Sequence, residues 1–116
     1  MDERIKKWLF DIITSINEID SYFENREKRF DLYKADKILK WAVERNLEII
    51  GEAVIRVFKK DPSIEIKNVK GIIGLRNLII HAYDNVSDEN IWAIIINHLP
   101  VLKTEINNIL NNDKTN

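Results

Sequence analysis

The chain contains no cysteine, so neither a disulfide framework nor a thiolate metal site is available to it. Only two histidines occur, His81 and His98, and their separation of seventeen residues fits none of the short zinc motifs. We therefore expect no metal site and no bound cofactor. Three glycines and two prolines are too few for the many turns of a β-protein, which favours a helical fold.

Long apolar runs are absent as well, because no stretch approaches the roughly 18 residues that a membrane-spanning helix needs. The segment MDERIKKWLFDII begins with charged residues and lacks the apolar centre of a secretion signal. These features predict a cytoplasmic protein with no membrane partner. The length of 116 residues, 45% of them hydrophobic, fits a single domain, predicted over 1–112 with a disordered tail at 113–116.

Charge is unevenly distributed, although the formal net charge is only −1. Residues 26–76 carry thirteen Lys and Arg against eight Asp and Glu, a net +5, whereas the segments before and after each carry −3. A mixed, solvated surface is one interpretation of this pattern. The other is a basic middle segment that meets phosphate, on a molecule too neutral for general nucleic-acid binding.

Apolar residues recur every three to four positions nearly throughout the chain, which indicates amphipathic helices. We expect four helices, at about 3–24, 34–60, 67–83 and 88–110. Pro62 should end the second helix, Ser87 should cap the fourth, and Pro100 should bend the fourth. Short connections between them predict an all-α antiparallel bundle of four to five helices.

Residues 71–86 read GIIGLRNLIIHAYDNV, an apolar run interrupted by an Arg, an Asn, a His and a Tyr. A helical wheel divides this third helix into three faces. The face predicted to pack in the core carries Gly71, Gly74, Leu75, Leu78 and Ala82. The face predicted to form a homodimer carries Val69, Ile72, Ile73, Arg76, Ile80 and Tyr83. The polar third face carries Lys70, Asn77 and His81.

These polar side chains suit a phosphodiester substrate. Arg76 is a permanent bidentate phosphate binder, and His81 can exchange a proton near neutral pH. Asn77 and Lys70 are predicted to position RNA phosphate. RNA carries its own nucleophile, the 2′-hydroxyl, so such a site is able to cut RNA without metal. The cleavage reaction needs both a base and an acid, but the motif offers only one His per chain, His81. A symmetric dimer would supply two.

Ordinary packing remains the alternative for Arg76 and His81, because cations near the end of a helix are favourable without any catalytic role.

His98 is predicted to be structural, on the apolar side of the fourth helix. Glu52 is expected to pair with Arg56 or Arg45 on the second helix. We predict that the three tryptophans are core or interface aromatics rather than base-stacking platforms: Trp8, Trp41 and Trp92.

The sequence resembles a known family at three places. RNLIIHAY, at 76–83, is similar to the Arg-x4-His-x-Tyr signature of the HEPN superfamily, specifically of the HepT-like toxins. AVERNLEIIGEA, at 42–53, resembles the second-helix signature of the same family. YDNVSDENIW and the following Leu-Pro continue the similarity, which covers about residues 5–110.

The resemblance implies an antiparallel HEPN-like bundle that dimerises with its motif helices facing each other, and a metal-independent ribonuclease toxic to its host cell. Arg76 and His81 would be catalytic, and Asn77 would fill the polar position after the arginine. Tyr83 would receive AMP from the partner antitoxin, a minimal nucleotidyltransferase that uses ATP. A rival interpretation is a non-catalytic helical binding subunit of that transferase. A DNA-binding regulator is not favoured, because no helix has a clustered basic face.

Overall fold

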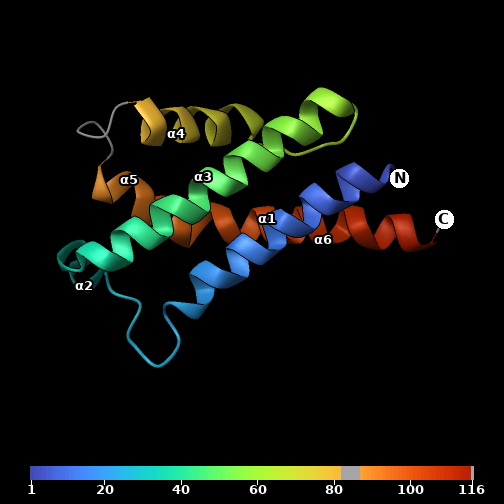
Figure 1. Ribbon diagram of the computed structural model, residues 1–116. Coiled ribbons are helices and arrows are strands. Elements are labelled where there is room, and N and C mark those ends of the chain that lie inside the picture. Colours follow the sequence, from blue (N-terminus) through green and yellow to red (C-terminus); the bar gives the residue numbers. More distant parts are fainter. Residues whose placement is uncertain (82–86, 116) are drawn as a thin grey trace.

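A computed structural model of the chain describes residues 1–81 and 87–115, with side chains through residue 113. Within these ranges the chain is helical, with no strand, which confirms the all-α prediction. The elements are α1 (Glu3–Ser21), α2 (Phe30–Ala35), α3 (Lys37–Lys60), α4 (Val69–His81), α5 (Asp88–Ala93), the π-helical turn η2 (Ile94–His98) and α6 (Leu99–Thr115) (Figure 1).

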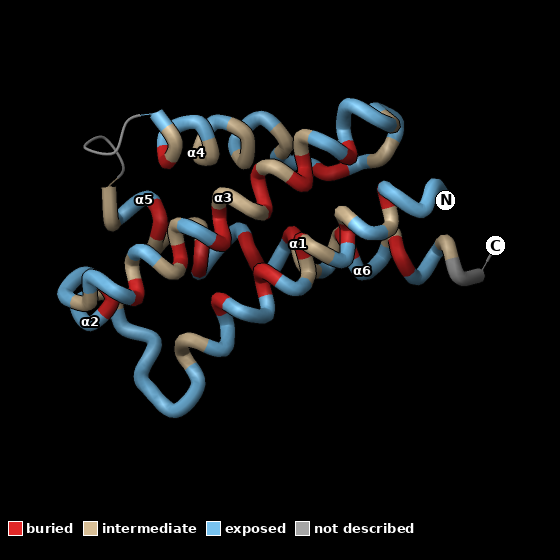
Figure 2. Tube along the Cα trace, in the orientation of Figure 1, coloured by how far each residue is buried: buried red, intermediate tan, exposed pale blue. Residues whose placement is uncertain are grey.

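Helix α3 lies at the centre of the bundle, between α1 and α6 on one side and α4 on the other (Figure 1). Successive long helices run in opposite directions, as the short connections predict. Each contributes an apolar stripe at three- and four-residue steps to one core, which Figure 2 shows as red segments where α1, α3 and α6 meet. The most deeply buried side chains are Leu9, Ile12, Ile16, Ile19, Val43, Val54, Ile91, Ile95 and Ile106.

The single helix predicted over 34–60 is wrong, because the chain breaks at Asp36 into α2 and α3. Asp36 has an extended backbone, and its carboxylate accepts a hydrogen bond from the Leu39 N–H at 3.0 Å. Short acidic side chains favour this capping position over a helix interior, which explains the break. The end of α3 at Lys60, just before Pro62, agrees with the prediction.

The fourth predicted helix is interrupted rather than simply bent. Ser87 caps α5 as expected, its hydroxyl accepting from the Asn90 N–H at 3.1 Å. The π-helical turn η2 comes immediately before Pro100 and adds one residue to that turn. Leu99 therefore follows Ile95 on the buried stripe, and α6 runs on to Thr115, beyond the expected end near 110.

The extra residue in η2 also corrects the prediction for His98. In an uninterrupted α-helix His98 and Leu99 would lie on either side of the line through Ile95, about 60° and 40° from it. The wider π-helical turn moves His98 further from the buried stripe, so Leu99 is buried and His98 is exposed.

Helix α4 packs on α3 alone among the described helices, and its face assignment differs from the prediction. Gly71, Gly74 and Leu78, which were expected in the core, are exposed. Val69 and Ile72, which were expected to face a second copy, pack against the core together with Leu75. The buried centre of α4 is Ile79, seen as its one red segment in Figure 2.

The close approach of α4 to α3 depends on Gly51, where an added Cβ would lie 2.5 Å from Arg76 Cβ. Gly74, on the open side of α4, has nothing within 4 Å of such an atom. We expect Gly51→Ala to lower the free energy of unfolding by about 1–2 kcal/mol, because overpacking outweighs the gain in helix propensity.

Gly74→Ala is the matched control, and it should raise the free energy of unfolding by about 0.5–1 kcal/mol. Urea unfolding followed by circular dichroism measures both variants. Two changes of the same sign would contradict the packing of α4 described above.

Candidate active site

Arg76 points from α4 toward α3, where Glu52 holds its guanidinium. Arg76 Nε and Nη2 both donate to Glu52 Oε1, and the Nε–Oε1 distance is 2.6 Å. The neighbouring Asn77 contributes a third contact, since its Oδ1 accepts from Arg76 Nη1 at 2.9 Å. Both partners of the ion pair are half-buried, with side chains 23% exposed for Arg76 and 34% for Glu52.

A guanidinium carries five N–H groups, and Glu52 and Asn77 accept from three of them. Among the described residues the other two have no acceptor. The side chain is therefore fixed in orientation while it keeps donors for a ligand, which is the arrangement that bidentate binding of a phosphate requires.

Glu52 comes from the centre of α3, beside Gly51, whose missing side chain makes room for the stem of Arg76. The partners that sequence spacing suggested for Glu52 are therefore wrong. Arg45 instead lies near Glu48, with Nη1 and Oε2 3.8 Å apart, and it is exposed. Local i,i+4 spacing cannot reveal a partner that arrives from another helix.

His81 is the last residue of α4 and is exposed, as are Lys70 and Asn77. His81 and Arg76 are about 140° apart around the helix, so they leave α4 on different sides. No hydrogen bond joins them in the part of the chain that is described. A shared Arg76–His81 cleft therefore stays a prediction, and Tyr83 lies outside the described residues.

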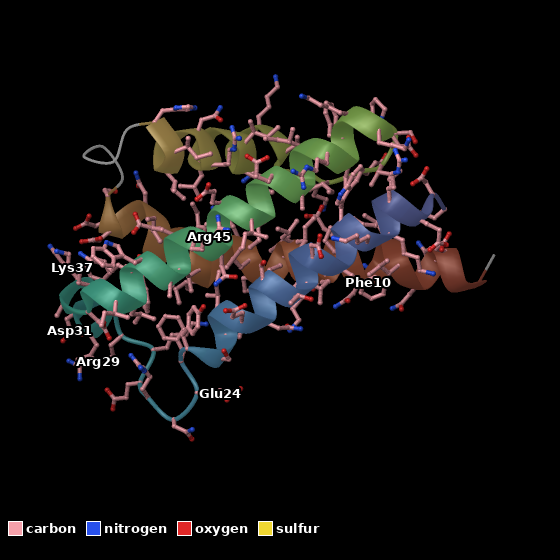
Figure 3. The ribbon with its side chains drawn as sticks, viewed as in Figure 1. Phe10, Glu24, Arg29, Asp31, Lys37 and Arg45 are labelled. Atoms are coloured by element: carbon pink, nitrogen blue, oxygen red, sulfur yellow. The ribbon has the colours of Figure 1, made fainter. Side chains whose placement is uncertain are left out.

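A shallow hollow of about 220 Å³ lies between α1 and α3, and Glu52, the partner of Arg76, is one of its lining residues. Its charged lining consists of two arginines, Arg45 and Arg56, and three carboxylates, Asp11, Glu48 and Glu52. Figure 3 labels Arg45 in the middle of α3 and Lys37 near its N-terminal end. The basic middle segment thus contributes two arginines set among carboxylates along α3, rather than a uniformly positive surface.

A smaller, mainly apolar cavity of about 100 Å³ lies between α4 and α6. Exposed His98 lies at its wall, together with Ile72 and Leu75 of α4. It lacks a cation on α4 comparable to Arg76, and the only lysine that lines it, Lys67, donates its backbone N–H to Glu105 Oε2 at 3.0 Å. This cavity therefore offers no counterpart to the oriented guanidinium that Arg76 presents on the α3 side of α4.

The described residues contain no group of three or more His, Cys, Asp or Glu side chains placed to hold a metal ion. None of the helices in these ranges combines the length and apolar character required to cross a membrane.

The helical bundle and the arginine of its motif helix agree with a known class of protein. A family model described as Ribonuclease HepT-like matches residues 12–109, so the chain belongs to the HepT-like family of the HEPN superfamily.

Curated relatives match over most of their length. The chain is 33% identical over 104 residues to "Putative RNase MJ1380" of Methanocaldococcus jannaschii, which covers 88% of this chain and 93% of that protein. It is 34% identical over 102 residues to "Probable ribonuclease HepT" of Thermococcus cleftensis, which covers 84% and 88%. No solved structure matches the chain.

The contribution of Glu52 to Arg76 can be measured separately from any activity. Glu52→Gln keeps the length of the side chain but removes its charge, so the free energy of unfolding should fall by about 1–2 kcal/mol. Glu48→Gln is the control, because its 3.8 Å contact to exposed Arg45 is expected to contribute less than about 0.5 kcal/mol. Equal losses in urea unfolding would show that Glu52 does not anchor Arg76.

Proposed function

We propose that the chain is a ribonuclease that cuts RNA without a metal ion, with Arg76 and His81 as catalytic residues. Membership of the HepT-like family and the names of the relatives support this reaction class. The observation that carries the proposal is the guanidinium of Arg76, held by Glu52 and Asn77 with two N–H groups remaining. Donors fixed before the substrate arrives stabilise developing charge at little reorganisation cost.

The proposed reaction is an internal transesterification of RNA. The 2′-oxygen attacks the adjacent phosphorus as a base removes the 2′-hydroxyl proton, and the bond to the 5′-oxygen breaks as an acid protonates that oxygen. The products are a 2′,3′-cyclic phosphate and a free 5′-hydroxyl. Arg76 binds the non-bridging oxygens, whose negative charge rises in the transition state, and Lys70 and Asn77 help position the phosphate.

A homodimer through α4 would complete this site, because the reaction needs a base and an acid and each chain offers one histidine on the motif helix. His81 is exposed and accessible for such an encounter. The open side of α4, with Gly74 and Leu78, lets another helix approach closely. We propose that His81 of one copy acts as base while its symmetry mate acts as acid.

We further propose that the chain is the toxin of a toxin–antitoxin pair, silenced when a minimal nucleotidyltransferase adds AMP to Tyr83. That tyrosine follows His81 by two positions in the sequence. A bulky, negatively charged group so near the site would repel RNA phosphates and block their approach.

Arg76→Ala should slow RNA cutting by about 10²–10³-fold, and His81→Ala by about 10²–10⁴-fold. Arg76→Lys should be intermediate, because an ammonium keeps the charge but cannot bind a phosphate bidentately. Cleavage of labelled RNA by the unmodified protein, with a chelator present, measures these effects. His98→Ala is the control and should leave the rate unchanged.

Loss of activity on addition of the chelator would refute the metal-independent mechanism. Unchanged cutting by both alanine variants would refute the assignment of Arg76 and His81. A protein that cuts no RNA but co-purifies with the transferase would favour the non-catalytic binding subunit.

Modification at Tyr83 is tested by the intact mass of the chain produced with and without the transferase. Co-production should add mass in steps of one AMP, and Tyr83→Phe should abolish those steps. Tyr33→Phe is the matched control, because Tyr33 is buried in the aromatic cluster of α2 and is inaccessible to a transferase. Persistence of the AMP steps in Tyr83→Phe would place the modification elsewhere.

A further inference from the structure

Among the described residues Trp41 is the most exposed aromatic, with 62% of the residue exposed, so it does not pack in the core, while the alternative of an interface residue stays a prediction. Trp8 and Trp92, by contrast, are half-buried against the core, and Trp92 contacts the rings of Phe23 and Tyr33. A single exposed aromatic is ordinary on a protein surface, so the case for a role of Trp41 rests on the groups around it.

Trp41 forms one wall of a hollow of about 420 Å³ between α3 and α4. The other lining residues are Glu44, Arg45, Glu48, Ile79 and Ile80. A hollow of this volume is within the range of ligand-binding pockets, and it combines an aromatic wall with a few polar groups.

This hollow lies along the face of α3 that also carries Glu52, because Trp41 and Glu52 are only about 20° apart around the helix. It shares Arg45 and Glu48 with the smaller hollow that is lined by Glu52, the partner of Arg76. Trp41 and Glu52 are eleven positions apart, which is about 16 Å of helix at 1.5 Å per residue. A single RNA strand whose phosphate binds Arg76 would therefore place a base beside Trp41 a few nucleotides away.

The cations around Trp41 suit a nucleotide. The ammonium of Lys37 lies 5.1 Å from the centre of the indole ring, over one face, and Arg45 lies in the hollow itself. The opposite indole face has no aromatic partner among the described residues and is able to stack on a base, while the two cations meet backbone phosphate.

Glu44 supplies a hydrogen-bond acceptor beside the indole. It is half-buried, burial raises the pKa of its carboxyl group, and its carboxylate accepts no hydrogen bond from the described residues. Glu48, in contrast, has Arg45 3.8 Å away. A carboxylate short of donors favours a base edge that offers two adjacent N–H groups, which guanine does and uracil does not.

We propose that Trp41 and Glu44 form a base-binding subsite for single-stranded RNA, in which guanine stacks on Trp41 and donates to the carboxylate of Glu44. The proposal rests on the proposed ribonuclease function, because it assigns a specificity determinant to the same face of α3. If guanine binds there, the hollow between α3 and α4 determines which phosphate of the RNA strand reaches Arg76.

The test measures binding rather than cutting, with uniformly 2′-O-methylated RNA hexamers that lack the 2′-hydroxyl nucleophile. Hexamers of uracil with a single guanine at each position in turn are compared with the all-uracil hexamer by fluorescence anisotropy, using the full chain. One guanine position should bind about tenfold more tightly than uracil. Trp41→Ala should weaken that complex about tenfold, whereas Trp41→Phe, which keeps a stacking ring, should retain most of the affinity.

Glu44→Gln should remove the preference for guanine without changing the affinity for the all-uracil hexamer. Ile38→Ala is the matched control, because Ile38 is 78% exposed, lies one turn before Trp41 and does not line the hollow. Its affinities should equal those of the unaltered chain.

Equal affinity of Trp41→Ala and the unaltered chain would overturn the subsite, as would equal binding of guanine and uracil. A change in oligomeric state of Trp41→Ala, seen by light scattering together with the loss of RNA, would also overturn it, because Trp41 would then be an interface residue. A chain that binds guanine through Trp41 but cuts no RNA refutes the ribonuclease alone. Cutting with an unaltered sequence preference in Trp41→Ala refutes the subsite alone.

Discussion

The ion pair between Arg76 and Glu52 determines the geometry of the whole candidate site. It joins the motif helix to the central helix, and it fixes the guanidinium in a half-buried position where water screens it less than at an open surface. Gly51 permits this contact, because any side chain there would collide with the stem of Arg76. The orientation of the Arg76 guanidinium and the packing of α4 on α3 thus depend on the same few atoms, and a change to either partner affects both.

An arginine already paired with a carboxylate binds a phosphate less strongly than a free one, because part of its charge is neutralised. It is also already oriented, so less side-chain entropy is lost when the substrate binds. Arg45 and Arg56 lie along the same side of α3, but Asp11, Glu48 and Glu52 line the same hollow, so the surface there is mixed in charge rather than basic. This mixture agrees with a chain whose formal net charge is only −1.

Much of the fold could be predicted from the sequence, because helical periodicity depends on local spacing alone. The stripes of α1 and α3, the Ser87 cap and the helix end before Pro62 follow from local chemistry and agree with the structure. The break at Asp36 and the π-helical turn before Pro100 could not be predicted without knowing how one side chain competes with a regular helix.

The candidate site was harder to predict than the fold. Arg76 was identified by its motif, but its partner Glu52 lies 24 positions away on another helix. The faces of α4 were assigned incorrectly because glycines suggest close packing, whereas these lie on its open side.

The attachment of α4 to a single neighbour has a consequence for control of the protein. Most of the buried side chains belong to α1, α3 and α6, whereas α4 contributes one buried residue, Ile79, and three half-buried ones, Val69, Ile72 and Leu75. Separating α4 from α3 would therefore break fewer buried apolar contacts than unfolding the whole bundle. It would also separate the guanidinium of Arg76 from its carboxylate, so a molecule that held α4 away from α3 would undo the orientation of that side chain at less free-energy cost than unfolding.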